Sequence, residues 1–178
     1  MRTRCDRYLK HMELLFSKER IATRVAQLGA AISQDYANTE IVAIVILKGA
    51  FMFAADLLRH INVPVTLEFM QIASYHNGTC SSGEVEIILD LHNDIAGKHV
   101  IVIEDILDSG RTLKALQSLL AKCNPASVKL CTLLDKRERR EVKIEADYVG
   151  MEIEDRFTVG YGLDHNGRYR QLEQIYVI

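Results

Sequence analysis

Carboxylates, hydroxyls and one glycine stand close together between residues 104 and 112. Glu104 and Asp105 directly follow the apolar run 100–103, whose four β-branched residues are typical of a buried parallel strand. A strand, a glycine-containing turn and a helix start together form an anion site, because the first helical amides lack intrahelical partners and Gly110 lets the backbone approach closely. The acids suit a ligand that also carries hydroxyls, a cation or a proton to be moved. The turn and helix start consist of Asp108, Ser109, Gly110, Arg111 and Thr112.

Helix capping is the competing explanation for these polar residues. Asp and Ser are favoured N-cap residues, and acidic side chains stabilise the positive end of a helix dipole. Taken one at a time, each acid fits capping better than catalysis. Capping does not require adjacent carboxylates at the end of a buried strand, however. At most one of Glu104 and Asp105 can face a core, and an unpaired buried carboxylate is costly, so the complete string favours a functional site.

The elements around this string predict an α/β fold, with a mostly parallel twisted sheet flanked by helices. Ser17 is expected to cap a helix whose apolar face carries Ile21, Val25, Leu28 and Ile32. Ligands of such sheets bind beyond the carboxyl ends of strands, so Lys48-Gly49, Glu104-Asp105 and Asp135-Lys136 are expected to line one crevice. Strands are expected at 41–47, 63–72, 85–89, 100–103, 128–134 and 148–153, and further helices at 51–58 and from Leu113 onwards.

Two segments do not fit regular elements. Residues 74–83 are polar, small and glycine-containing, which predicts an exposed mobile loop. Residues 155–170 mix glycines, aromatic residues and arginines, which predicts a loop-rich hood. The whole chain, 1–178, is expected to form a single domain.

Composition excludes several classes of protein. The chain is 48% apolar and 26% charged, as is ordinary for a globular protein, and its formal charge of −2 argues against nucleic-acid binding. The N-terminus is dense in charge and lacks the apolar core of a signal peptide, and no apolar run is long enough to span a bilayer. The four cysteines form no C-x-x-C pair, which favours free thiols in a reducing cytosol and a cytoplasmic protein. They are Cys5, Cys80, Cys123 and Cys131.

The string from residue 100 to 113 resembles the phosphoribosyl-diphosphate motif of the type I phosphoribosyltransferases: an apolar strand, two acids, two apolar residues, then Asp-Ser/Thr-Gly-x-Thr. Four further segments resemble the 6-oxopurine members of that family, the hypoxanthine-guanine phosphoribosyltransferases. They occur in family order and are residues 47–53, the loop from Ser74-Tyr75 to 81–85, residues 133–137 and residues 155–164. The loop centre, 76–80, does not clearly match.

The resemblance implies purine salvage. The 5-phosphoribosyl group would pass from phosphoribosyl diphosphate to N9 of hypoxanthine or guanine, giving IMP or GMP and releasing pyrophosphate. It also implies a requirement for Mg²⁺, a homodimer or homotetramer, no membrane or nucleic-acid partner, a lid formed by 74–83 and a purine-binding hood that includes 155–170.

The resemblance also assigns a role to individual positions. Asp108 matches the general base for purine N7, and residues 104, 105 and 108–112 match the phosphoribosyl site. Lys48, Gly49, Ser74, Tyr75 and Arg170 match pyrophosphate contacts, and the bond between Leu47 and Lys48 is often cis in the family. Glu104, Asp105 and Asp164 match acids that meet Mg²⁺. The purine pocket is implied at Ile106, Lys136, Phe157, Thr158 and Asp164.

Other interpretations stay open at this point. The base specificity could be that of xanthine-guanine, adenine or orotate enzymes, although Lys136 and the Phe157 segment argue against adenine. A phosphoribosyltransferase fold could also act as an RNA-binding regulator, but that would require a basic face. Taken singly, Phe157 fits a core residue, Lys136 a solvated charged run and Arg170 a surface position.

Overall fold

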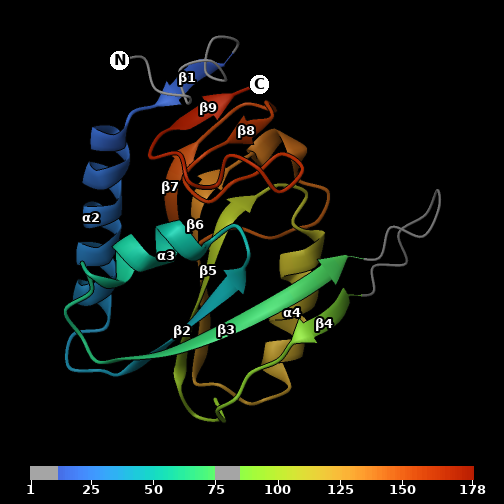
Figure 1. Ribbon diagram of the computed structural model, residues 1–178. Coiled ribbons are helices and arrows are strands. Elements are labelled where there is room, and N and C mark those ends of the chain that lie inside the picture. Colours follow the sequence, from blue (N-terminus) through green and yellow to red (C-terminus); the bar gives the residue numbers. More distant parts are fainter. Residues whose placement is uncertain (1–11, 75–84) are drawn as a thin grey trace.

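A six-stranded sheet forms the centre of the computed structural model, which describes residues 12–74 and 85–178 (Figure 1). The strand order is β4-β3-β2-β5-β6-β7, and every neighbouring pair is parallel except β3 with β4. This confirms the expected mostly parallel α/β fold. The strands are β2 (Ile41–Leu47), β3 (Val65–Ser74), β4 (Val85–Leu89), β5 (His99–Leu107), β6 (Ser127–Asp135) and β7 (Tyr148–Glu152).

Helices cover both faces of this sheet (Figure 1). Alternate residues of the central strands belong to two separate apolar clusters: Ala43 and Ile101 pack on the side of α2 (Lys18–Asp35) and α3 (Phe51–Leu58), whereas Val42 and Val100 pack with α4 (Arg111–Ala121). Burial on both faces explains why these strands are continuous apolar runs rather than alternating ones. The expected cap is confirmed, because Ser17 Oγ accepts a hydrogen bond from the Arg20 amide at 3.3 Å and the four predicted residues of α2 are buried.

The boundaries of β3 and β5 differ from the prediction. β3 runs from Val65 to Ser74 instead of 63–72, so Ser74 ends a strand and does not begin a loop. β5 continues through both acids to Leu107. Its pairing with β2 stops at Val45↔Ile103, whereas its pairing with β6 extends to Leu107↔Asp135. Glu104 and Asp105 therefore lie where β5 has lost one of its two neighbours. The rest of the predicted loop, 75–83, lies outside the described residues.

The hood is a small antiparallel sheet with the order β1-β9-β8 (Figure 1). It consists of β1 (Glu13–Phe16), β8 (Thr158–Val159) and β9 (Ile175–Val177). The prediction of a hood at 155–170 found β8 but not the two terminal strands. Strands this short carry no readable alternation, and Leu14 and Tyr176 pair only because the fold brings the two ends of the chain together.

Two smaller findings bear on the composition. No helix within 12–74 and 85–178 is long and apolar enough to cross a membrane. Cys123 is exposed and Cys131 is buried, and both are free thiols, as expected. Cys5 and Cys80 lie outside the described residues.

Candidate active site

Two adjacent carboxylates, Glu104 and Asp105, are half-buried near the carboxyl end of β5. Glu104 Oε1 accepts from the Asp105 amide at 3.2 Å, and Asp105 Oδ1 accepts from the Ile106 amide at 3.0 Å. Burial raises the pKa of both carboxyls, and that of Glu104 is raised further by the neighbouring charge of Asp105. The pair is thus short of positive partners and suits hydroxyl donors or a cation.

The chemistry of this donor set fits Mg²⁺. Mg²⁺ prefers oxygen ligands, keeps several waters, and in nucleotide and phosphate sites is held by one or two carboxylates together with substrate phosphates. Glu104 and Asp105 supply that number of carboxylates, and their raised pKa values mark a place where a cation would be stabilised.

Asp164 does not join this pair. Its Oδ1 lies 2.6 Å from Arg170 Nη2, and its Oδ2 accepts from the Gly167 amide at 2.7 Å. In the part of the chain that the structure describes, no three His, Cys, Asp or Glu residues form a group that could hold a metal ion. Asp164 thus stands apart from the carboxylate pair, with Arg170 as its partner.

The turn after β5 ends in a left-handed glycine. Gly110 has φ +82° and is the N-cap of α4, with no side-chain capping bond. The capping explanation for the acids is therefore wrong at this helix. Ser109 Oγ contacts the Arg111 amide at 3.5 Å, the outer limit for a hydrogen bond, and Asp108 instead pairs with Arg139, with 3.3 Å between Oδ1 and Nε. The turn and the start of α4 present the backbone arrangement of an anion site.

Arg140 stabilises this turn through hydrogen bonds to its backbone, a role that the sequence did not reveal. Its guanidinium donates to the carbonyls of Leu107, at 3.0 Å, and of Asp108, and it also pairs with the buried carboxylate of Asp135. The residue lies in a charged run that predicts solvated surface. The contact becomes visible only in the fold, because the parallel pairing of β5 with β6 brings the segment that carries Arg140 next to the turn after β5.

The loop after β2 approaches the acids so closely that no side chain fits between them. The Leu47–Lys48 peptide bond is cis, as the resemblance implies. A Cβ at Gly49 would lie 1.7 Å from Asp105 Oδ2. On the other side, a Cβ at Gly162 would lie 2.1 Å from the Gly49 carbonyl oxygen. The Gly49 backbone therefore lies against the Asp105 carboxylate on one side and against the hood backbone at Gly162 on the other.

The predicted pyrophosphate residues are partly assembled here. Arg170 Nη1 donates to the Gly162 carbonyl at 2.6 Å, which places this half-buried arginine beside Gly49. Its charge also lowers the pKa of Asp105, against the larger effect of burial. Lys48 is exposed at the same loop. The side chain of Ser74 is not among the described groups, and Tyr75 lies outside the described residues.

The predicted purine residues lie in β5, directly after β6, and in or next to β8 of the hood. Lys136 is only 7% exposed, and its amide donates to the Leu107 carbonyl at 3.0 Å. Phe157 is 54% exposed and meets His165 edge to face, with 5.3 Å between ring centroids. The interpretations of Lys136 as solvated and of Phe157 as core are thus both wrong. Thr158 is buried in β8, and Ile106 is half-buried opposite Leu134.

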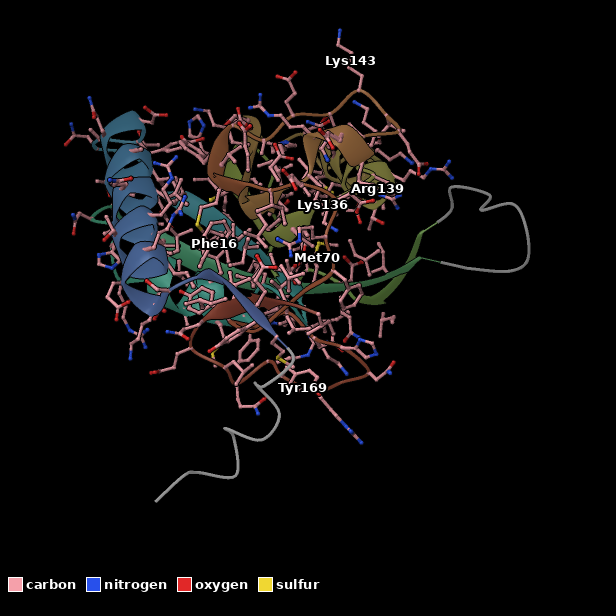
Figure 2. The ribbon with its side chains drawn as sticks, turned by 90° about the horizontal axis from the view of Figure 1, so that it is seen from above. Phe16, Met70, Lys136, Arg139, Lys143 and Tyr169 are labelled. Atoms are coloured by element: carbon pink, nitrogen blue, oxygen red, sulfur yellow. The ribbon has the colours of Figure 1, made fainter. Side chains whose placement is uncertain are left out.

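Lys136 and Asp108 are joined through two residues for which the sequence suggested no role. Asp155 Oδ1 lies 3.3 Å from Lys136 Nζ, and its Oδ2 lies 3.6 Å from Arg139 Nε. Arg139 in turn contacts Asp108. Figure 2 labels Lys136 and Arg139, which lie near one another because both contact Asp155. No sequence pattern marks this network, because Asp108, Asp155 and the segment that carries Lys136 and Arg139 belong to three separate loops.

Comparison with known proteins gives a consistent result. Residues 11–166 match the family model of the phosphoribosyl transferase domain. The chain is 45% identical over 168 residues to a hypoxanthine phosphoribosyltransferase of Haemophilus influenzae, covering 93% of this chain and 94% of the relative. It is 46% identical over 166 residues to a hypoxanthine-guanine phosphoribosyltransferase of Bacillus subtilis, covering 93% and 92%.

Solved structures agree with these sequence matches. A hypoxanthine phosphoribosyltransferase of Staphylococcus aureus superposes with a TM-score of 0.94 at 44% identity, covering 100% of this chain and 96% of that one. A hypoxanthine phosphoribosyltransferase of Trypanosoma cruzi, in complex with the product IMP, superposes with a TM-score of 0.87 at 42% identity, covering 94% and 93%.

Proposed function

The chain belongs to the phosphoribosyltransferase family, among the hypoxanthine and hypoxanthine-guanine enzymes, and we propose here how its own residues carry out the reaction. The protein is a purine-salvage transferase that converts hypoxanthine to IMP, with phosphoribosyl diphosphate as the donor. Guanine is proposed as a second substrate. The observation that carries the assignment of residues is the half-buried carboxylate pair near the end of β5, shortly before the helix start of α4.

The phosphoribosyl group occupies the turn and helix start. Its 5-phosphate accepts hydrogen bonds from the backbone and hydroxyl groups of residues 108–112, and the ribose hydroxyls donate to Glu104 and Asp105. These two carboxylates are also the residues that would hold Mg²⁺, with Asp164 at a second position. When bound, Mg²⁺ would neutralise the negative charge of the polyphosphate.

The pyrophosphate leaves across the Gly49 loop. Lys48 and Arg170 supply positive charge there. Gly49 approaches Asp105 closely, and because it has no side chain its backbone stays accessible to phosphate oxygens. Ser74 and Tyr75 are proposed to reach the same group from the loop that follows β3. The predicted closure of that loop as a lid would exclude water from the reaction.

The base stacks on the exposed ring of Phe157, beside Ile106. Lys136 donates to the 6-oxo group, and the backbone around Thr158 and Asp164 reads the rest of the base edge. The bond from C1′ to pyrophosphate breaks as the bond from C1′ to N9 forms, and Asp108 accepts the proton from N7. The positive charge that develops on the ribose favours nearby carboxylates and phosphate oxygens.

Three further proposals rest on family membership. The chain acts as a single phosphoribosyltransferase domain over residues 1–178, and the match over 11–166 supports this. It works in the cytoplasm. It assembles as a homodimer or homotetramer, which sedimentation of the purified protein would measure.

Product analysis tests the function. Purified protein is incubated with phosphoribosyl diphosphate, Mg²⁺ and one base at a time: hypoxanthine, guanine, xanthine, adenine or orotate. We expect IMP and GMP to form together with pyrophosphate. Turnover of adenine or orotate alone would refute the assignment, as would salt-sensitive RNA binding without any turnover.

A further inference from the structure

One carboxylate, that of Asp155, connects the two groups proposed to handle the purine base. It contacts Lys136 through Oδ1, at 3.3 Å, and Arg139 through Oδ2, at 3.6 Å. Arg139 Nε then lies 3.3 Å from Asp108 Oδ1. The four side chains alternate in charge, and they come from the turn after β5, the segment after β6 and the segment before β8.

The two ends of this series of four charged side chains differ in environment. The Lys136 side chain is 8% exposed, and a buried ammonium is costly unless a carboxylate balances its charge. Asp155 is about half exposed and provides that balance. Arg139 is also about half exposed, and its pKa is raised by the hydrogen bond to Asp108 first and by the charge of Asp155 second. Asp155 therefore matters most for Lys136, and Arg139 most for Asp108.

The neighbouring arginines have other partners. Arg137 Nη2 lies 2.8 Å from Glu152 Oε1, and Arg140 pairs with Asp135 and donates to the backbone carbonyls of Leu107 and Asp108. Arg139 is the arginine of this segment whose guanidinium contacts the side-chain carboxylate of Asp108, the predicted general base. Its bond to Oδ1 leaves Asp108 Oδ2 to meet a substrate proton.

We propose that Asp155 and Arg139 are positioning residues for the base: Asp155 fixes the ammonium of Lys136 toward the 6-oxo group, and Arg139 fixes the carboxylate of Asp108 toward N7. Recognition of the base and acceptance of its proton then both depend on Asp155, which contacts Lys136 directly and reaches Asp108 through Arg139. This inference rests on the proposed function, because it assumes that Lys136 binds the 6-oxo group and that Asp108 accepts the N7 proton.

Asp155→Asn is the informative change. An amide has one acceptor oxygen and presents a donor on its other side, so it can serve Lys136 or Arg139 but not both. We expect the Kd for IMP, measured by calorimetry, to rise about 10- to 100-fold, the loss typical of a hydrogen bond to a charged group. The Kd for ribose 5-phosphate, which lacks the base, is expected to stay unchanged. Asp155→Glu, which restores both acceptor oxygens, is expected to recover most of the IMP affinity.

Arg139→Gln separates the second part of the network. Lys136 keeps its contact with Asp155, so IMP affinity is expected to change little, while kcat with hypoxanthine falls because Asp108 loses its orientation. Glu138→Gln is the matched control. It removes one exposed charge from the same short helical turn, η1 (Arg137–Arg139), and is expected to leave both constants at the wild-type values.

Each outcome has a definite meaning. If Asp155→Asn binds IMP as tightly as Glu138→Gln does, or weakens ribose 5-phosphate as much as IMP, Asp155 has no positioning role toward the base. An unchanged kcat in Arg139→Gln removes Arg139 from the proposal. A wild-type protein that binds IMP but catalyses no transfer would refute the proposed function and leave the binding test intact, whereas one that does not bind IMP would overturn both.

Discussion

A single methyl group at Gly49 is expected to disable the phosphoribosyl site while leaving the fold in place. In Gly49→Ala the new Cβ would lie 1.7 Å from Asp105 Oδ2 and 2.4 Å from Asp105 Cγ. Ordinary contact begins at 3.4 Å, so the carboxylate oxygen must retreat by the missing 1.7 Å or the loop must move by a similar amount. Either movement takes Asp105 or the Gly49 backbone away from the substrate.

Two magnitudes follow from this overlap. Overpacking of this kind costs about 1–3 kcal/mol of folding stability, which for a chain of this size lowers Tm by roughly 2–4 °C per kcal/mol. A misplacement of about 1 Å in a positioned group costs about 100-fold in rate, so kcat/KM for phosphoribosyl diphosphate is expected to fall by about that factor. Hypoxanthine contacts lie elsewhere, and we expect IMP to retain part of its affinity through the base.

The assay needs a variant that loses stability without touching the site. Gly97→Ala is that control, because Gly97 precedes β5 at the opposite end from the acids, and a Cβ there has no neighbour within 4 Å. Its φ of +69° makes a side chain strained by about 1–2 kcal/mol. Calorimetric Tm and steady-state kinetics on both variants are expected to show similar stability losses, with a fall in kcat/KM only in Gly49→Ala.

A wild-type kcat/KM in Gly49→Ala would show that the close approach of Gly49 to Asp105 is not needed for catalysis. A double-mutant cycle with Asp105→Ala provides a second check, since truncating Asp105 removes the atoms that the new methyl group meets. The stability cost of Gly49→Ala is then expected to shrink in the Asp105→Ala background. Additive costs would show that the overlap lies with some other group.

Three further outcomes are expected. Excess chelator is expected to abolish transfer and added Mg²⁺ to restore it, because two adjacent half-buried carboxylates would otherwise face a polyphosphate; full turnover in chelator contradicts the metal role. Asp108→Asn keeps the shape of the side chain but cannot accept the N7 proton, so kcat is expected to fall by roughly 10²- to 10⁴-fold while phosphate affinity changes much less. A near-normal kcat would remove Asp108 from the base role. Lys136→Gln is expected to lower kcat/KM for hypoxanthine and to narrow its advantage over adenine, which in sites built around one hydrogen bond reaches about 10⁴; an unchanged ratio between the two bases would exclude Lys136 as the specificity contact.

Local sequence patterns were sufficient to predict most of the strands and helices of the central sheet. The apolar run at Ile41–Leu47 became β2, and the spacing of Ile21, Val25, Leu28 and Ile32 became the buried face of α2. These predictions succeeded because strand and helix periodicity depends on neighbours in sequence. The acid-rich string after residue 103 also placed the start of α4, because a glycine-containing turn directly before a run of helically spaced leucines marks a helix start.

Only the tertiary structure decided how these groups are partnered. The extension of β5 to Leu107 depends on pairing with β6, and the terminal strands β1 and β9 exist because the two ends of the chain meet in the hood. The burial of Lys136, the brace at Arg140 and the link through Asp155 each join segments that fold into place separately. An ion pair between distant loops leaves no periodic trace in a sequence, because it depends on geometry that exists only after the sheet has formed.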